Sequence, residues 1–379
     1  MKFIISRQEL GDLTNRIQNI VAPKSPVLIL SNFLIEAIDN QVIITATDLT
    51  VGVRCSMPAK VIEPGSITIP AKRFSSLIRE LTTAHIEVRT QAKEMITITA
   101  ESSTFKMHGL PIDEFPKLPD FQDAAQIRMK QSELKEMFFR TAFAVSKEDS
   151  RYILTGVSLQ IVNNIVMFVG TDGKRLARAG FPLATEPMIN AECIIPLKAV
   201  DEIVKNLNDP EEESTLFILQ DKIAVESGSM LIVTKLLSGD YPDVNKVIPQ
   251  ATNSSVSLHK DELMSLLRQV SLFTTEKHHS VRFTFTPGEL NLSVNTMDLG
   301  EGKVSMAANY DGPRFDIAFN PMYFLDILRH SKQETISISF SDPYNPTLIT
   351  DGEHIFSVNS VLPSPLFILM PTRLNESVG

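Results

Sequence analysis

The sequence predicts an α+β protein made of three similar units, each with two helices and antiparallel sheets. The first observation is an apolar pattern at offsets i, i+3 and i+4 that occurs three times, about 125 residues apart. Its copies are Phe74-Ser-Ser-Leu77-Ile78-Arg-Glu-Leu81, Val200-Asp-Glu-Ile203-Val204-Lys-Asn-Leu207 and Phe324-Leu-Asp-Ile327-Leu328. The second observation is that strand-like runs surround each copy in the same order. A fixed period indicates one structural unit used repeatedly, and units of domain size build arcs and rings.

Length and composition agree with a chain of several domains. A chain of 379 residues is too long to fold around one ordinary hydrophobic core. Its composition, 43% hydrophobic and 21% charged residues, is typical of a globular protein. Three periods cover nearly the whole chain. We therefore place the domains at residues 1–124, 125–252 and 253–379, with boundaries in the loops around 123–127 and 250–255.

Each unit opens with an amphipathic helix, predicted at residues 7–21, 130–147 and 259–277. Apolar residues recur on one face of each segment, as expected for a helix that packs against a core. These stripes are Leu10, Leu13 and Ile17 in the first unit, Leu134, Phe138 and Thr141 in the second, and Leu263, Leu266, Leu267 and Val270 in the third.

Strand-like runs follow each helix at matching places. The first set lies at residues 42–48, 165–172 and 290–296, and two of these runs end in a Thr-Asp pair, which favours a turn. Shorter runs at 66–70, 192–196 and 315–321 carry a proline near the helix start and lead into second helices at 71–81, 197–207 and 321–332. Units one and two also share a closing motif, Glu114-Phe115-Pro116 and Asp240-Tyr241-Pro242. The order of strand, helix and three strands occurs twice in each unit, which predicts six helices and antiparallel sheets.

Charge is unevenly distributed along the chain. The net charge of −9 argues against a protein that coats nucleic acid by bulk charge. The six predicted helices nevertheless carry 16 Lys and Arg against 11 Asp and Glu, a net +5, so the remaining residues carry −14. One interpretation is a helix-lined basic surface that faces phosphates, and the other is that helices simply present charged faces to water. The main basic residues on these helices are Lys72, Arg73, Arg79, Lys130, Arg140, Lys147, Lys198 and Lys205.

No constellation of catalytic residues is present, so we expect a protein that is not an enzyme and uses no cofactor or metal. The segment Gly170-Thr-Asp-Gly173-Lys-Arg175 lacks the spacing of a phosphate-binding loop and predicts a turn between strands. Asp48 and Asp172 occur at equivalent places in two units, which favours a structural turn over catalysis. The pair His278-His279 has no nearby cysteine, which favours plain surface over a metal site.

The sequence also limits the expected location. No apolar run approaches the roughly 20 residues of a membrane helix. The start, Met1-Lys2-Phe3-Ile4-Ile5-Ser6, is too short for a secretory signal, and Cys55 and Cys193 give no disulfide framework. We therefore expect a cytoplasmic protein without a membrane partner.

Four motifs occur in order along the threefold repeat. They are Arg151-Tyr152-Ile-Leu154-Thr-Gly156, Gly170-Thr-Asp-Gly-Lys-Arg-Leu176, Gly239-Asp-Tyr-Pro-Asp243 and Met370-Pro371-Thr372-Arg373-Leu374. Together they resemble the bacterial DNA sliding clamps, the β subunits of the replicative DNA polymerase, over residues 1–374. The resemblance implies a processivity factor: a head-to-tail homodimer whose six domains close around duplex DNA. Such a ring is held by topology, and weak, sequence-independent phosphate contacts permit sliding.

The resemblance implies residue roles at two surfaces of such a ring. By similarity, the helices line the hole, and the DNA-facing residues are Lys24, Arg73, Arg79, Lys147, Tyr152 and Lys198. The dimer contact joins the first domain of one subunit to the third domain of the other. There, Phe105 and Met107 on an edge strand are expected to meet Leu272 and Phe273, which would also hide an aggregation-prone edge.

The third implied site is a groove between the second and third domains. In the family it captures short peptides, with a glutamine and hydrophobic residues, from polymerases, the clamp loader and repair proteins. An adaptable apolar pocket of Leu, Val, Ile, Met and Pro suits such a task. The matching positions are Leu154, Thr171, Gly173, Lys174, Arg175, Leu176, Pro242, Lys246, Val247, Tyr323, Ile368, Met370, Pro371, Thr372, Arg373 and Leu374.

This sequence departs from the family's pattern near these sites. Lys174 stands where many relatives carry histidine, and Thr372 where methionine is common, so we expect the groove to rank its peptides differently. Glu148 occupies a loop position that is often neutral in relatives, which weakens the expected DNA contact there. Residues Asn375 to Gly379 extend past the usual end and are candidates to lie near the groove.

Two other functions stay open from the residues alone. One is a multidomain scaffold that binds peptides without encircling DNA. The other is an enzyme whose catalytic residues are too dispersed along the chain to recognise in one sequence.

Overall fold

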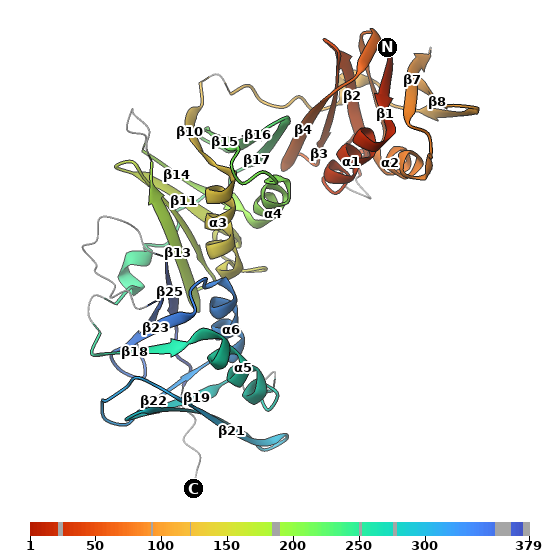
Figure 1. Cartoon of the computed structure of the whole chain (residues 1–379). Coiled ribbons are helices and arrows are strands. Elements are labelled where there is room, and N and C mark those ends of the chain that lie inside the picture. The colour runs from red at the N-terminus through yellow and green to blue at the C-terminus, as the bar shows by residue number, and fades with distance from the viewer. Residues whose placement is uncertain are drawn as a thin grey trace. The chain divides into compact units, whose positions relative to one another are not determined.

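The computed structural model describes residues 1–21, 26–91, 94–121, 123–183, 190–249, 252–275, 279–352 and 365–373 (Figure 1). The chain forms two compact units. The first combines residues Met1–Leu134 with Lys198–Leu236, and the second combines Lys135–Leu197 with Leu237–Gly379. The middle third of the chain therefore contributes to both units. The domain boundaries that we place near residues 124 and 252 stay predictions.

The six predicted helices are all present in the described residues. They are α1 (Arg7–Ile17), α2 (Ala71–Glu80), α3 (Gln131–Thr141), α4 (Leu197–Asn206), α5 (Lys260–Ser271) and α6 (Pro321–His330). The first helix of each repeat ends before the end of its predicted range, at residues 17, 141 and 271 instead of 21, 147 and 277. For α3 the cause is a close approach, because Gly170 packs directly against the carbonyl of Thr141, and a short 3-10 turn at Ala142–Ala144 follows.

The first unit contains two antiparallel sheets. The larger, in spatial order, consists of β10 (Ala125–Lys130), β15 (Glu213–Ile218), β16 (Lys222–Ser227), β17 (Met230–Lys235), β4 (Val51–Pro58), β3 (Gln41–Thr47), β2 (Asn32–Ile38) and β6 (Gly65–Pro70). The smaller consists of β5 (Lys60–Glu63), β1 (Lys2–Ser6), β7 (His85–Gln91), β8 (Met95–Ala100) and β9 (Ser103–His108). Strand β9 is an edge of the smaller sheet.

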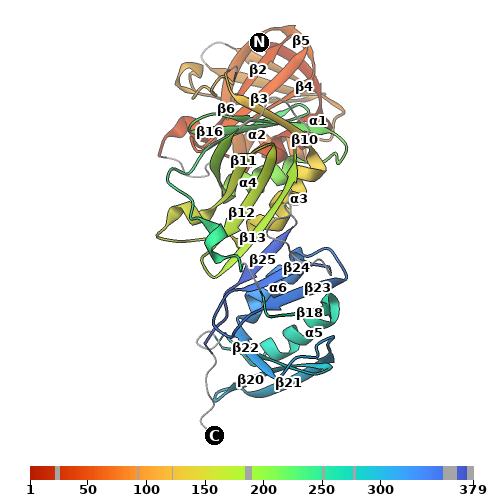
Figure 2. The ribbon, with the colours of Figure 1, turned by 90° about the vertical axis from the view of Figure 1, so that its left-hand side faces the viewer.

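The second unit also contains two antiparallel sheets. The larger consists of β14 (Ala191–Pro196), β11 (Gly156–Val162), β12 (Ile165–Thr171), β13 (Arg175–Pro182), β25 (Leu366–Leu369), β24 (Thr347–Asp351), β23 (Thr335–Phe340) and β18 (Ser254–His259). The smaller consists of β21 (Gly300–Ala307), β20 (Glu289–Thr296), β19 (Val281–Thr286) and β22 (Phe315–Phe319). Figure 2 shows β11, β12, β13 and β25 side by side in the larger sheet.

The two eight-stranded sheets are equivalent strand by strand. In each, four strands of one repeat join four strands of the next, through the antiparallel pair β17·β4 in the first unit and β25·β13 in the second. The registers also match, because Val233 lies opposite Gly52 and Ile368 lies opposite Leu176. A hydrogen bond just beyond each pair repeats as well: the N–H of Lys235 donates to Thr50 at 3.0 Å, and that of Met370 donates to Lys174 at 2.9 Å.

The two smaller sheets correspond to the two halves of such an eight-stranded sheet. Strands β1, β7, β8 and β9 match β10, β15, β16 and β17, whereas β21, β20, β19 and β22 match β4, β3, β2 and β6. In the larger sheets, the strands equivalent to β9 and β21 pair with each other. In the described residues β9 and β21 each end a sheet.

The first residue of each repeat's first helix bonds to the segment that follows the second helix. The N–H groups of Arg7, Gln131 and Lys260 donate to Ala84, Glu212 and Glu334 at 3.0, 2.8 and 2.8 Å. The Arg7 side chain also donates to the Ile78 carbonyl at 3.0 Å, and the Lys260 ammonium to Ser331 at 3.3 Å. The Ile78 and Ser331 carbonyls lie at helix C-termini, where carbonyls lack partners within their own helix. Part of the positive charge on the helices is therefore structural.

The predicted apolar stripes face the cores. Of the ten stripe residues, nine are buried, and Leu266 packs half-buried against the core of the second unit. Helices α1 and α2 pack against each other, as do α5 and α6 (Figure 1). Within the described residues, no helix combines the length and apolar character needed to cross a membrane.

Candidate functional site

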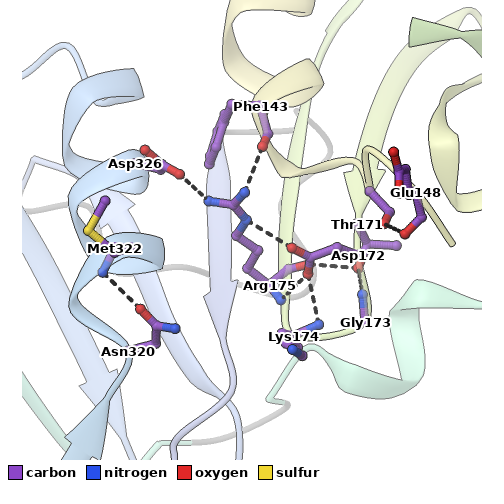
Figure 3. A network of polar contacts seen from close by, with 11 residues as sticks. Phe143, Glu148, Thr171, Asp172, Gly173, Lys174, Arg175, Asn320, Met322 and Asp326 are labelled. Carbon is purple, nitrogen blue, oxygen red and sulfur yellow. Dashed lines mark hydrogen bonds and ion pairs between the residues drawn. The ribbon is translucent and has the colours of Figure 1, made fainter. Parts of the chain in front are cut away.

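The turn between β12 and β13, with the first residues of β13, carries five of the residues predicted to bind peptides. The Thr171 hydroxyl donates to the Arg175 carbonyl at 2.6 Å and accepts from the Gly173 N–H at 3.1 Å. The Asp172 Oδ1 atom accepts from the N–H groups of Lys174 and Arg175 at 2.9 and 3.0 Å (Figure 3). Gly173 has φ +82°, a conformation that glycine adopts without strain. The turn is thus held by its own side chains.

The same turn occurs between β3 and β4 of the first repeat. Thr47 donates to the Val51 carbonyl at 3.0 Å, and Asp48 accepts from the N–H groups of Thr50 and Val51 at 2.9 and 2.7 Å. Burial by itself would raise the pKa of Asp48, but these bonds and the bonded Lys198 ammonium outweigh it and lower the pKa. The structural interpretation of the Thr-Asp pairs is therefore confirmed.

Arg175 is the central polar residue of the site. Its guanidinium donates to Asp172 at 3.1 Å, to Asp326 of α6 at 2.6 Å and to the Phe143 carbonyl at 3.0 Å (Figure 3). It also lies 4.7 Å from the ring centroid of Tyr323, within the range of cation–π attraction. Since Arg175 is largely buried, it fixes the turn and α6 in one arrangement and has little capacity left for a ligand.

An apolar cluster packs against the turn between β12 and β13. Leu154, Leu176 and Ile368 are buried in it together with Tyr241 and Val244. Burial raises the pKa of Tyr241, whose hydroxyl lies 3.4 Å from the Val169 carbonyl. Val247 and Met370 remain 39% and 37% exposed and form the accessible apolar surface beside the turn.

The C-terminal segment after β25 is fixed by main-chain bonds. Beyond the bond from Met370 to Lys174, the Thr372 N–H donates to the Ala318 carbonyl at 2.8 Å. The Thr372 hydroxyl lies 2.7 Å from the Ser280 hydroxyl. Thr372, at a position where the resemblance leads us to expect methionine, therefore takes part in a bond between two hydroxyl groups, in which methionine could offer only a weakly accepting sulfur.

The remaining predicted peptide-site residues lie on the same unit. Pro242 and Lys246 are exposed on the loop that also carries Val247, and the Lys246 ammonium lies 3.6 Å from Asp243. Pro371 is half-buried and Arg373 is exposed at the end of the described segment. Leu374 and the tail Asn375 to Gly379 lie outside the described residues. The others lie on or next to β13, β25, α6 and their loops, some buried and some exposed, and peptide binding there stays a prediction.

Several residues important to this site were missed from the sequence. Asp326 and Phe143 hold Arg175, and neither has a motif that marks it. Tyr241 and Val244 belong to the supporting cluster, and the repeated closing motif Asp240-Tyr241-Pro242 was the available signal. Met322, which is exposed next to Tyr323, adds apolar surface on α6.

The equivalent position in the first repeat is built differently. Gly52 occupies the place of Leu176, and the Leu118 side chain lies against it, only 2.6 Å from where a Cβ atom of residue 52 would be. Leu49, with φ 73°, replaces Gly173. The Leu118 side chain therefore covers this position in the first unit, whereas the second unit holds the Leu176 side chain there.

The predicted DNA-facing residues have mixed environments. Arg73, Arg79 and Lys147 are exposed, and the exposed Tyr152 donates its hydroxyl to the Ser238 carbonyl. Lys198 is exposed but bonded to Asp48. Lys24 lies outside the described residues. Contact of these residues with DNA stays a prediction.

Arg140 corrects the interpretation of helix charge. It was counted among the basic surface residues, but it is only 6% exposed and is bound to Glu136 at 2.7 Å and to Asp351. Burial alone would lower the pKa of Arg140, but its bonds to Asp351 and Glu136 raise it. A charge at a helical position can thus serve an internal ion pair, which periodicity does not reveal.

The predicted dimer residues lie at sheet edges or beside them. Phe105 is half-buried on β9, and Leu272 is 77% exposed just after α5. Met107 is only 5% exposed within its own unit, and its expected contact with a partner stays a prediction. Phe273 packs against β21 at Gly302.

The structure gives no support to a metal site at the pair His278-His279. His278 lies outside the described residues. Within the part of the chain that is described, no group of three or more His, Cys, Asp or Glu side chains could hold a metal ion.

Comparison with known proteins gives consistent matches along the chain. Models of the DNA polymerase III beta subunit match residues 1–119 (N-terminal domain), 128–243 (central domain) and 245–364 (C-terminal domain). The beta sliding clamp of Chlamydia muridarum is 50% identical over 99% of this chain and 100% of its own length, and that of Vibrio cholerae is 28% identical over the same shares. The sliding clamp structure from Bacillus subtilis has a TM-score of 0.93 at 26% identity, covering 99% of this chain and 100% of that one.

We predict that Arg175→Met lowers the free energy of unfolding of the second unit by roughly 2 to 4 kcal/mol, since two carboxylates and a carbonyl lose their donor. The five tyrosines, Tyr152, Tyr241, Tyr310, Tyr323 and Tyr344, all lie in the second unit, and the chain has no tryptophan. Tyrosine fluorescence during urea unfolding therefore reports this unit.

The matched control is Arg329→Met, which removes one exposed ion pair with Asp326 and should cost under about 1 kcal/mol. Equal losses for the two variants would contradict the central role of Arg175.

Proposed function

We infer the function from one premise, that this chain belongs to the DNA polymerase III beta subunit family, the bacterial DNA sliding clamps. It has the sliding-clamp fold of three domains and is a processivity factor for DNA replication, not an enzyme. We propose that two copies assemble head to tail into a ring of six domains that encircles duplex DNA. We further propose that the ring acts in the cytoplasm and uses no cofactor.

The observation that carries the ring proposal is the pairing of strands between repeats. Repeats one and two share one eight-stranded sheet, and repeats two and three share its equivalent. The two remaining half-sheets belong to repeats one and three and end in β9 and β21. Pairing β9 of one copy with β21 of a second copy would complete a third equivalent sheet. It would also satisfy main-chain groups along two edge strands.

The internal pairs suggest the register of this contact. Ser103 lies opposite Ala100, just as Met230 lies opposite Ser227, so Ser103 of β9 corresponds to Met230 of β17. Gly300 lies opposite Thr296, just as Gly52 lies opposite Thr47, so Gly300 of β21 corresponds to Gly52 of β4. Applying the pairing of β17 with β4 then places Ser103 opposite Lys303 and Lys106 opposite Gly300 of the partner.

The proposed contact joins two different surfaces, so it is heterologous. Such a contact builds a closed ring only if the rotation between copies fits, and an open filament otherwise. We propose that the contact closes into a ring of two copies, which together supply six similar repeats. Leu272, highly exposed beside β21, is suited to be buried there, as is Phe105 on β9.

DNA binding is proposed to be sequence-independent. The helices carry the positive charge of an otherwise acidic chain, and phosphate contacts of lysine and arginine weaken as salt rises. The proposed DNA-facing residues are Arg73, Arg79, Lys147, Tyr152 and Lys198, with Lys24 outside the described residues. Because a closed ring is retained by topology, such contacts need not be strong.

Replication proteins are the proposed partners of the surface around Arg175. The replicative polymerase, the clamp loader and repair proteins would each present a short peptide with a glutamine and hydrophobic residues. The exposed side chains of Val247 and Met370 supply apolar contact area, and the fixed turn beneath them limits the ordering cost of binding.

We predict that the protein, once loaded by the clamp loader and ATP, stays on nicked circular DNA and is released when the circle is cut. Leu272→Glu should shorten retention on the circle at least several-fold, since a charge at the contact must be desolvated when the ring closes. Gel filtration of DNA–protein complexes measures both effects.

Val162→Glu is the matched control, because Val162 is a 52% exposed apolar residue of the same unit outside the proposed contact. Equal retention on circular and linear DNA would favour a peptide-binding scaffold that does not encircle DNA.

We predict that Met370→Glu weakens binding of polymerase-derived peptides at least tenfold, because it places a charge on the apolar surface that the peptide must cover. Fluorescence anisotropy of a labelled peptide measures this, with Val162→Glu again as the control. Unchanged affinity would remove the surface around Met370 as the peptide site.

A further inference from the structure

A histidine packs against two phenylalanines where repeats two and three meet. The His330 ring, at the end of α6, lies 4.1 Å from the Phe143 ring, centroid to centroid, and the two planes differ by only 10°. The Phe139 ring of α3 lies 4.7 Å from the His330 ring, at 42°. Phe139 and Phe143 belong to repeat two and His330 to repeat three. These three side chains, the aromatic stack, therefore join the two repeats.

The His330 ring is held in one orientation. Its Nδ1 atom lies 2.7 Å from the Asp326 carbonyl, and since a carbonyl can only accept, Nδ1 carries the proton of the neutral ring. At the other end of the stack, the Arg175 guanidinium lies 5.4 Å from the centroid of the Phe143 ring and donates to the Phe143 carbonyl (Figure 3). The stack thus reaches the residue that fixes the turn between β12 and β13.

Two carboxylates flank the aromatic stack, Asp326 one turn before His330 on α6 and Glu136 one turn before Phe139 on α3. Both already bind cations, as does Asp351 of β24. The ion pairs are Asp326 with Arg175 and Arg329, Glu136 with Arg140 and Lys332, and Asp351 with Arg140. A proton on His330 would therefore add a positive charge beside several others, with no carboxylate of this set left for it.

The titration of His330 agrees with this geometry. Burial lowers the pKa of His330 below its usual value, and the Arg175 and Arg329 charges lower it further, although the Asp326 carbonyl and carboxylate act in the opposite direction. The ring therefore stacks in its neutral form near pH 7. Because the unfolded chain binds this proton more readily, folding stability falls as the pH drops below about 6.5, until the folded-state pKa is passed.

We propose that His330 is a proton-sensitive contact between repeats two and three, which holds α6 against α3 when neutral and loosens that packing when protonated. All of the residues involved lie in the second unit, so the inference does not depend on the proposed ring or on the proposed peptide site. Asp326, on the last turns of the same helix, binds Arg175. A looser α6 in acid would therefore also weaken the hold of Arg175 on its turn.

The first test is the titration of the His330 ring itself. Nuclear magnetic resonance of the full chain, labelled at its histidines and assigned with His330→Phe, follows this ring directly. Its midpoint should lie below about 6.5, the value of an unperturbed histidine. A midpoint at or above that value would mean that the two phenylalanine rings favour the imidazolium through cation–π attraction, which would overturn the proposal.

The second test is urea unfolding of the second unit, followed by tyrosine fluorescence at about pH 7.5 and pH 5, on either side of the usual histidine range. Acid should raise the unfolding equilibrium constant of the wild type several-fold more than that of His330→Phe, which keeps a ring but takes no proton. Each unit by which the pKa is lowered corresponds to a factor of about ten.

The matched control is His279→Gln, which removes an exposed histidine of the same unit and should respond to acid as the wild type does. Equal responses of the wild type and His330→Phe would contradict the proposal. A response that disappears with His279→Gln instead would assign the proton to another site and would contradict it as well.

Discussion

Antiparallel pairing of strands between successive repeats is the constraint on which the rest of the structure depends. It occurs at β17·β4 and at β25·β13, with the same register and the same flanking hydrogen bond. Neither half of such a sheet satisfies its edge alone, so each repeat needs a neighbour on both sides. A chain of three repeats meets this need twice and leaves β9 and β21. The main chain alone, before any side chain is considered, is therefore the basis on which we propose a second copy.

Side chains then make the two equivalent junctions, at β17·β4 and β25·β13, chemically different. Both Thr-Asp turns hold themselves by the same hydrogen bonds, yet Leu118 covers Gly52 in the first repeat while Leu176 lies in an apolar cluster in the second. Arg175 binds the second turn to Asp326, whereas Asp48 of the first turn is bonded to Lys198. The features that the repeats share are suited to hold the proposed ring together and to bind DNA. The features that differ between repeats are suited to bind partner proteins.

Much of this was predictable from the sequence, because periodicity reports which face of a helix is buried. The stripe from Leu10 to Ile17 was predicted correctly for that reason, and the Thr-Asp turns because their residue types favour turns. Periodicity carries no information on charges that pair inside the protein, so the burial of Arg140 against Asp351 was missed. Periodicity also does not show which face of an edge strand turns inward, so the burial of Met107 was not predicted. The end of α3 depends on the close approach of Gly170, a tertiary contact.

The most direct test of the account is a disulfide across the proposed contact, with Ser103→Cys and Lys303→Cys in one chain. Opposed residues of paired strands lie within disulfide range. The native Cys55 and Cys193 are buried, which raises the pKa of each to about 12 and keeps them unreactive. Oxidation should give a covalently closed species with the mass of two chains, faster than in the shifted pair Ser103→Cys with Ser305→Cys. A ladder of higher multimers, or no cross-linked dimer, would contradict the account.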